Sequence, residues 1–87
     1  MNYISIDFYS KGGTVGRSYV RSKVQAIKVL RQHGLSRNAA RTAVNTRCET
    51  EIGYKNDVRI SVAGGLLTVS KWVPDNNSST NFRKDPG

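Results

Sequence analysis

The sequence predicts an α+β fold, a small three-stranded antiparallel sheet with two helices packed on one face in the order β-α-α-β-β. Apolar and polar residues alternate with a period of two near the start of the chain and again between residues 58 and 72, which is typical of strands. Between these segments, two stretches repeat their apolar residues with the period of a helix. The chain has 87 residues, enough for one core, so we expect a single compact domain over residues 1–73.

The first strand is predicted over residues 3–9. Ile4, Ile6 and Phe8 alternate there with more polar side chains, so the strand has one buried face. Residues 10–16 follow, with three glycines among the last five. This composition indicates a turn or loop.

The first helix is predicted from Ser18, a suitable N-cap, to about residue 32. Its apolar stripe has spacings of four, three and three and consists of Val20, Val24, Ile27 and Leu30. Its cationic side lies opposite this stripe and consists of Arg17, Arg21 and Lys28.

The second helix is predicted from residue 37 to about residue 48. Gly34 suits the left-handed position after a helix, and Ser36 suits the N-cap of the next one. The buried face consists of the small residues Ala39, Ala40, Ala43 and Val44, and the exposed face consists of Asn38, Arg41, Thr42 and Asn45.

A β-hairpin is predicted around Gly64-Gly65, a dipeptide that favours a two-residue turn. This register pairs Val62 with Leu67 and Ile60 with Val69, and it places Arg59, Ser70 and Trp72 on the other face. The expected sheet edges are residues 4–8 and 66–73, where a second protomer could pair to form a homodimer. The predicted core consists of Ile4, Ile6, Phe8, Val20, Val24, Ile27, Leu30, Val44, Val58, Ile60, Val62, Leu67 and Val69.

Residues 74–87 lack any apolar period, so we expect a disordered C-terminal tail. The first eight residues carry neither a basic group nor a long apolar run, and no stretch approaches the about 20 apolar residues of a membrane span. We therefore expect no signal peptide and no membrane anchor. Cys48 is the single cysteine, which fits a reducing cytoplasm.

The charge distribution is the strongest functional signal. The formal net charge is +8, and no acid occurs between Asp7 and Glu49. Nine Lys and Arg residues lie between positions 11 and 47. Uncompensated positive charge of this kind repels itself and attracts polyanions. The sequence therefore predicts a nucleic-acid-binding module.

Catalysis is poorly supported by the composition. The chain has one His, one Cys and six acids scattered along its length. General acid–base catalysis uses groups with opposed pKa shifts in one cleft, and a metal site uses three or four ligands at tight spacing. Neither pattern is present, so we expect no enzyme activity, no metal site and no cofactor.

Residues 29–44 resemble a helix-turn-helix motif, in which a glycine turn and a serine N-cap precede a helix that enters the major groove. Gly34, Leu35 and Ser36 fit this pattern. Leu30 departs from it, since a small residue is usual there, and His33 stands where an apolar residue is usual. A plain αα-hairpin has the same turn glycine and serine N-cap, so both interpretations stay open.

The resemblance implies DNA binding in preference to RNA binding. Arg and Asn side chains on the second helix are types that pair with guanine and adenine. The candidate residues for binding nucleic acid or another anionic partner are Lys11, Arg17, Arg21, Lys28, Arg31, Arg37, Asn38, Arg41, Asn45 and Arg47. Lys11 stands in the glycine loop, which could touch a phosphate or could be a simple connector.

Other functions fit the same residues. A small phage or mobile-element inhibitor, of anti-CRISPR or anti-restriction type, could bind a host nucleoprotein complex through the basic face. A basic ribosome-associated protein is a third candidate. The open sheet face is a further candidate surface, because aromatic and Arg side chains there could stack unpaired bases. Its expected residues are Tyr3, Tyr9, Arg59 and Trp72.

Overall fold

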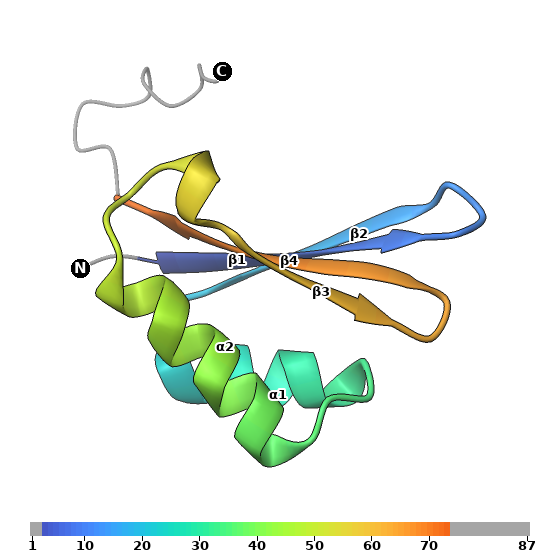
Figure 1. Cartoon of the computed structure of the whole chain (residues 1–87), viewed down its shortest axis with the longest axis horizontal. Helices are drawn as coiled ribbons and strands as arrows, with labels where there is room; N and C mark the ends of the chain where they lie inside the picture. Colours follow the sequence, from blue (N-terminus) through green and yellow to red (C-terminus); the bar gives the residue numbers. More distant parts are fainter. Residues whose placement is uncertain (1–2, 74–87) are drawn as a thin grey trace.

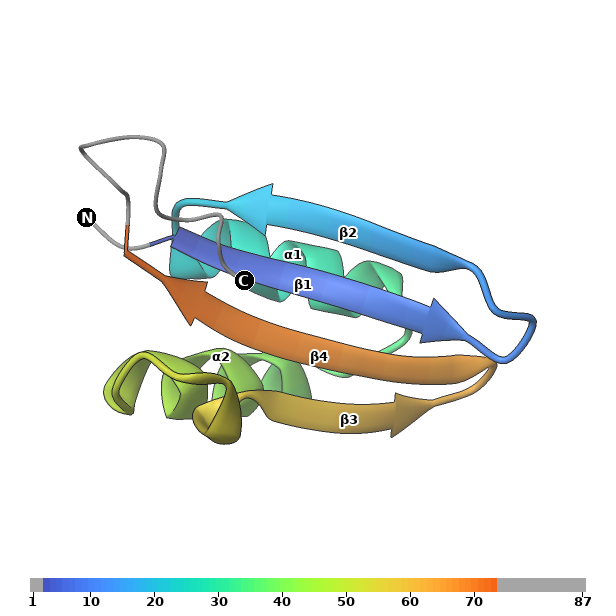
Figure 2. The same ribbon diagram turned by 90° about the horizontal axis from the view of Figure 1, so that it is seen from above.

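The protein folds into two layers, a four-stranded sheet and two helices that cover one of its faces (Figures 1 and 2). The computed structural model describes residues 3–73, and the tail predicted for residues 74–87 lies outside the described residues. The elements are β1 (Tyr3–Ser10), β2 (Val15–Val20), α1 (Lys23–Gln32), α2 (Arg37–Glu49), the short 3-10 helix η1 (Tyr54–Asn56), β3 (Val58–Val62) and β4 (Gly65–Trp72). The α+β class is confirmed.

The predicted strand count and order are wrong, because residues 15–20 form a strand. The sheet order is β2-β1-β4-β3, and all neighbours are antiparallel. The predicted edges are also wrong, since β1 and β4 pair with each other in the middle and β2 and β3 form the edges. Strand β2 carries no apolar alternation, because its core-side positions opposite Phe8 and Ile6 are Gly16 and Ser18.

The turns of both hairpins lie at the same end of the sheet (Figure 1). In the first turn, Gly13 has φ +94°, and the Ser10 backbone N–H donates to the Thr14 carbonyl at 2.8 Å. The Lys11 N–H donates to the carbonyl of Gly64, in the other turn, at 2.8 Å. The glycine-rich segment therefore closes a β-hairpin and joins its turn to that of the second hairpin.

Helix α1 begins four residues later than predicted. Its N-cap is Ser22, whose Oγ accepts a hydrogen bond from the Gln25 N–H at 3.2 Å. The helix buries Ala26 and Leu30. The predicted stripe is wrong for Val20, which belongs to β2, and for Val24, which is 72% exposed. The helix packs on the sheet through Ala26 and Leu30, and Val24 lies about 120° or more from both of them around the helix.

Helix α2 follows the prediction closely. Gly34 has φ +102°, and the Ser36 Oγ accepts from the Ala39 N–H at 3.1 Å. The helix buries Ala40, Ala43 and Val44, while Ala39 is exposed. The Ser36 cap is therefore confirmed, and the apolar face is narrower than predicted.

The second hairpin forms with a register two residues from the predicted one. Val62 pairs with Gly65 and Ile60 pairs with Leu67, so the turn is Ala63-Gly64, with Gly64 at φ +90°. A shift of two residues keeps every side chain on its predicted face. The core follows as expected for Ile4, Ile6, Leu30, Val44, Leu67 and Val69, all of which are buried.

Replacing Gly65 with alanine is expected to destabilise the sheet. A Cβ at this position would lie 2.2 Å from the Tyr9 carbonyl oxygen, so β1 and β4 would have to separate. The expected loss is about 1–3 kcal/mol, measured as the urea midpoint. Gly16→Ala is the matched control in β2, where a Cβ would meet nothing within 4 Å. Equal midpoints for the two variants would contradict this account.

Candidate nucleic-acid interface

Helices α1 and α2 form an open groove on the side of the molecule away from the sheet's free face. The groove has a volume of about 650 Å³. Val24, Ile27 and Leu35 give it an apolar surface. The polar side chains that line it are Lys28, Arg31, Gln32, Arg37 and Arg41. We refer to it as the helical groove.

The four cations of the helical groove have no ion-pair partner among residues 3–73. Four acids fall in this part of the chain, and two of them are already paired. Asp7 binds Arg17, and Asp57 contacts Arg47. The other two, Glu49 and Glu51, stand at the end of α2 and just after it, far from the helix start that lines the groove. The groove is therefore an uncompensated positive surface.

The starts of both helices add to this positive charge. Lys23 is the first residue of α1 and Arg37 is the first residue of α2, and neither first turn contains an acid. The partial positive charge of a helix N-terminus favours anions there, by about 0.3–1 kcal/mol for each group. Cations at these positions oppose helix stability, so helix formation does not explain them.

Four of the ten predicted binding residues meet in the helical groove, namely Lys28, Arg31, Arg37 and Arg41. Arg21 is exposed in the connection between β2 and α1. Lys11 is exposed in the β1–β2 turn, remote from the helices (Figure 1). The structure thus brings cations of the two helices together on one surface. Lys11, in the β1–β2 turn, is not part of this surface.

The predicted base-reading residues of α2 are divided between its two flanks. Arg41 lines the helical groove. Asn38 lines a second, shallower groove between α2 and β3, together with Thr42, Val58 and Ile60. Asn45 is half-buried. Asn38 and Arg41 are both exposed, as predicted, and they are neighbours on the helix surface, although each lines a different groove.

Arg17 lies on the opposite face of the sheet from the helices. Its Nε donates to Asp7 Oδ1 at 2.8 Å and its second amino group donates to Asp7 Oδ2 at 3.0 Å. The hydrogen bond to Asp7 is the main cause of a raised Arg17 pKa. Arg17 belongs to β2, so the prediction that it shares a helical face with Arg21 and Lys28 is wrong.

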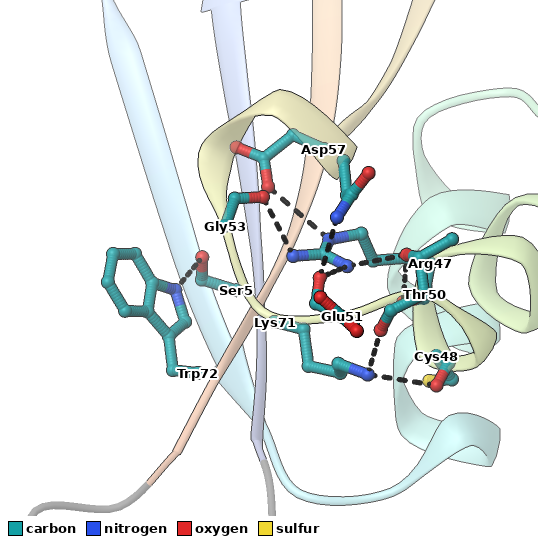
Figure 3. Close-up of polar contacts among 10 residues, drawn as sticks. Ser5, Arg47, Cys48, Thr50, Glu51, Gly53, Asp57, Lys71 and Trp72 are labelled. Carbon is teal, nitrogen blue, oxygen red and sulfur yellow. Dashed lines mark hydrogen bonds and ion pairs between the residues drawn. The ribbon is translucent and has the colours of Figure 1, made fainter.

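Arg47 is fully buried, which corrects its prediction as an exposed binding residue. Its guanidinium donates to Thr50 Oγ1 at 2.8 Å, to the Glu51 carbonyl at 3.1 Å and to the Gly53 carbonyl at 3.2 Å. Its Nε lies 3.3 Å from Asp57 Oδ1, as Figure 3 shows. Arg47 therefore holds the loop that leads from α2 to β3.

The two departures from the helix-turn-helix pattern both serve the sheet. Leu30 is fully buried in the core. The His33 ring stacks on Phe8 of β1, with centroids 4.9 Å apart. The pair of helices is thus packed on the sheet through the same positions at which its sequence departs from the motif.

The sequence did not reveal Tyr19 as a surface group, because β2 was predicted to be partly loop and partly helix. The available signal was an alternation in size, since the large Val15, Arg17 and Tyr19 alternate with the small Gly16 and Ser18.

Within residues 3–73, no helix is long and apolar enough to cross a membrane. No three His, Cys, Asp or Glu side chains gather there as a metal site would require.

Removing the Arg47 side chain is expected to destabilise the fold. Arg47→Met would leave Asp57 and two carbonyls of the connecting loop without their partner. Breaking a buried ion pair in this way costs about 3–5 kcal/mol, which a urea titration would measure. Arg41→Met is the matched control, because Arg41 is exposed and its replacement should cost less than about 0.5 kcal/mol. Similar losses in both variants would refute a structural role confined to Arg47.

The chain was also compared with known proteins. No protein-family model matches it, and no match was found among curated proteins or solved structures.

Proposed function

We propose that this protein binds nucleic acid through the helical groove, with duplex DNA as the first candidate. The observation that carries the proposal is the convergence of Lys28, Arg31, Arg37 and Arg41 on one open surface. No acid from residue 8 to residue 48 offsets them. A phosphate backbone supplies negative charges along a line, and neutralising them releases counterions, which favours binding.

The exposed side chains of α2 favour duplex DNA over other polyanions. Arg37, Asn38, Arg41 and Thr42 are all exposed on the first half of the helix. This half of a recognition helix contacts base edges in helix-turn-helix proteins. With α2 in a major groove, Asn38 and Arg41 would point toward the same set of base edges, because residues three apart lie about 60° from each other around a helix. Phosphate contacts from the helical groove would then supply most of the affinity.

A second candidate is a small inhibitor that binds a protein within a nucleoprotein complex. The observation that favours it is the apolar part of the helical groove, where Val24 is 72% exposed beside Ile27 and Leu35. An apolar floor with a cationic rim suits an acidic amphipathic protein segment better than a phosphate backbone. The same groove residues serve both candidates, so a direct binding measurement separates them.

The salt dependence of duplex binding tests the first candidate. Neutralising about four phosphates predicts a slope near −4 in a plot of log K against log salt concentration. Arg41→Ala should weaken binding at every salt concentration and reduce the magnitude of the slope by about one. Lys55→Ala is the matched control, because it removes the same charge from an exposed position on η1.

A mobility-shift titration of duplex DNA, single-stranded DNA and RNA at two salt concentrations provides these values. If Arg41→Ala and Lys55→Ala weaken binding equally, the affinity depends on the net charge of the protein and not on the helical groove. Absence of any shift at low salt would remove the nucleic-acid proposal. The inhibitor would then be supported if a protein partner, captured after nuclease treatment, is lost with Arg41→Ala and kept with Lys55→Ala.

A further inference from the structure

The face of the sheet that the helices leave open carries an unusual set of side chains. Strand pairing places Trp72 beside Tyr3, Tyr19 beside Ser5, and Val15 beside Tyr9. These positions alternate with Ile4, Ile6 and Phe8, which contact the helical layer. The face therefore presents four aromatic rings from three neighbouring strands, namely Tyr3, Tyr9, Tyr19 and Trp72.

Three of these rings are substantially exposed. Tyr19 is 61% exposed, Trp72 is 42% exposed and Tyr9 is 39% exposed. Burying a large aromatic ring is strongly favourable, so leaving three of them at the surface of one small sheet loses that gain. Grouped aromatic side chains with free faces indicate a binding surface.

Polar contacts hold the rings in place. The Trp72 indole N–H donates to Ser5 Oγ at 3.0 Å (Figure 3), and the Tyr9 hydroxyl donates to Asp7 Oδ2 at 3.2 Å. The Tyr3 and Tyr19 rings meet edge to face with centroids 6.0 Å apart. Side chains that are already ordered lose little conformational entropy when a partner binds.

The charge of the face complements a phosphate chain. Its acid, Asp7, is occupied by Arg17 and Tyr9. Arg59 stands on the same face, in register with Thr68 and Asp7, and has no ion-pair partner among residues 3–73. Arg17 is also half-exposed, since 51% of its side chain is accessible. Among residues 3–73, the face thus combines aromatic rings with the neutral Asp7–Arg17 pair and one further cation, Arg59.

We propose that this open sheet face is a second binding surface, where Tyr19 and Trp72 stack on unpaired bases of single-stranded nucleic acid. Tyr19 on β2 and Trp72 on β4 flank β1 and are offset by two residues along it, so their Cα atoms lie about 12 Å apart at the usual strand dimensions. Aromatic side chains on a sheet, with cations beside them, bind single strands in a way that tolerates any base sequence. A duplex cannot use this surface, because its bases already stack on one another. The proposal concerns the face opposite the helical groove and does not depend on binding there.

Fluorescence of Trp72, the one tryptophan of the chain, provides the test. Titrating the full chain with a 12-nucleotide oligo(dT) or oligo(U) should quench the emission, whereas a 12-base-pair duplex should not. Tyr19→Ala should weaken oligonucleotide binding about 5- to 100-fold, and Tyr19→Phe should keep it within about twofold because the ring remains.

The matched control is Tyr54→Ala, which removes a ring that is 83% exposed on η1, an element outside the strands that form this face. It should bind as the unmodified chain does. The proposal is overturned if single strands cause no quenching, if Tyr19→Ala binds as tightly as Tyr54→Ala, or if duplex quenches as strongly as single strand. Arg41→Ala should reduce single-strand binding no more than Lys55→Ala does. The proposal for the open sheet face and the proposal for the helical groove can therefore be contradicted independently of each other.

Discussion

Pairing between β1 and β4 is the constraint on which the rest of the structure depends. It joins eight residue pairs, from Tyr3 with Trp72 to Ser10 with Gly65, and so brings together the two ends of the described chain. Each hairpin alone would be marginally stable. Once the two central strands pair, they form one sheet wide enough to support both helices.

The register of this pairing also decides which side chains face the helices. Ile4, Ile6, Leu67 and Val69 enter the core, while Ser5, Asp7, Thr68 and Ser70 take the other side. A slip of one residue would exchange the two sets. The close fit of Gly65 against the Tyr9 carbonyl fixes the register at the end where the turns lie. The helical groove and the open sheet face are therefore consequences of a single alignment.

The sequence predicted best what local physics controls. The Ser36 cap, the small buried residues of α2 and the alternation of β1 each need only a few neighbouring residues. Strand β2 was missed because its core-side residues, Gly16 and Ser18, are not apolar, and only pairing with β1 makes it a strand. The placement of Arg47 was open to prediction, because it follows Ala40 and Val44 at helical spacing on the buried face. Because Arg47 is cationic, it was predicted to be an exposed binding residue instead.

The cations next to α2 have different roles at the two ends of the helix. At the C-terminal end, the Lys71 ammonium donates to the carbonyls of Cys48 and Thr50, and Arg47 donates to Thr50 Oγ1. The Lys71 bonds satisfy carbonyls at the end of the helix, and both cations suit the partial negative charge there. At the N-terminal end, Arg37 meets the partial positive charge, with Arg41 one turn later.

The C-terminal cations thus contribute to folding, and the N-terminal ones oppose it. Lys28 and Arg31 of α1 line the same groove as Arg37 and Arg41, which increases the repulsion. Residues 3–73 supply no acid that would relieve it. A cluster that costs stability, and that packing does not require, supports the proposed binding of a negatively charged partner, whose charge would offset this repulsion.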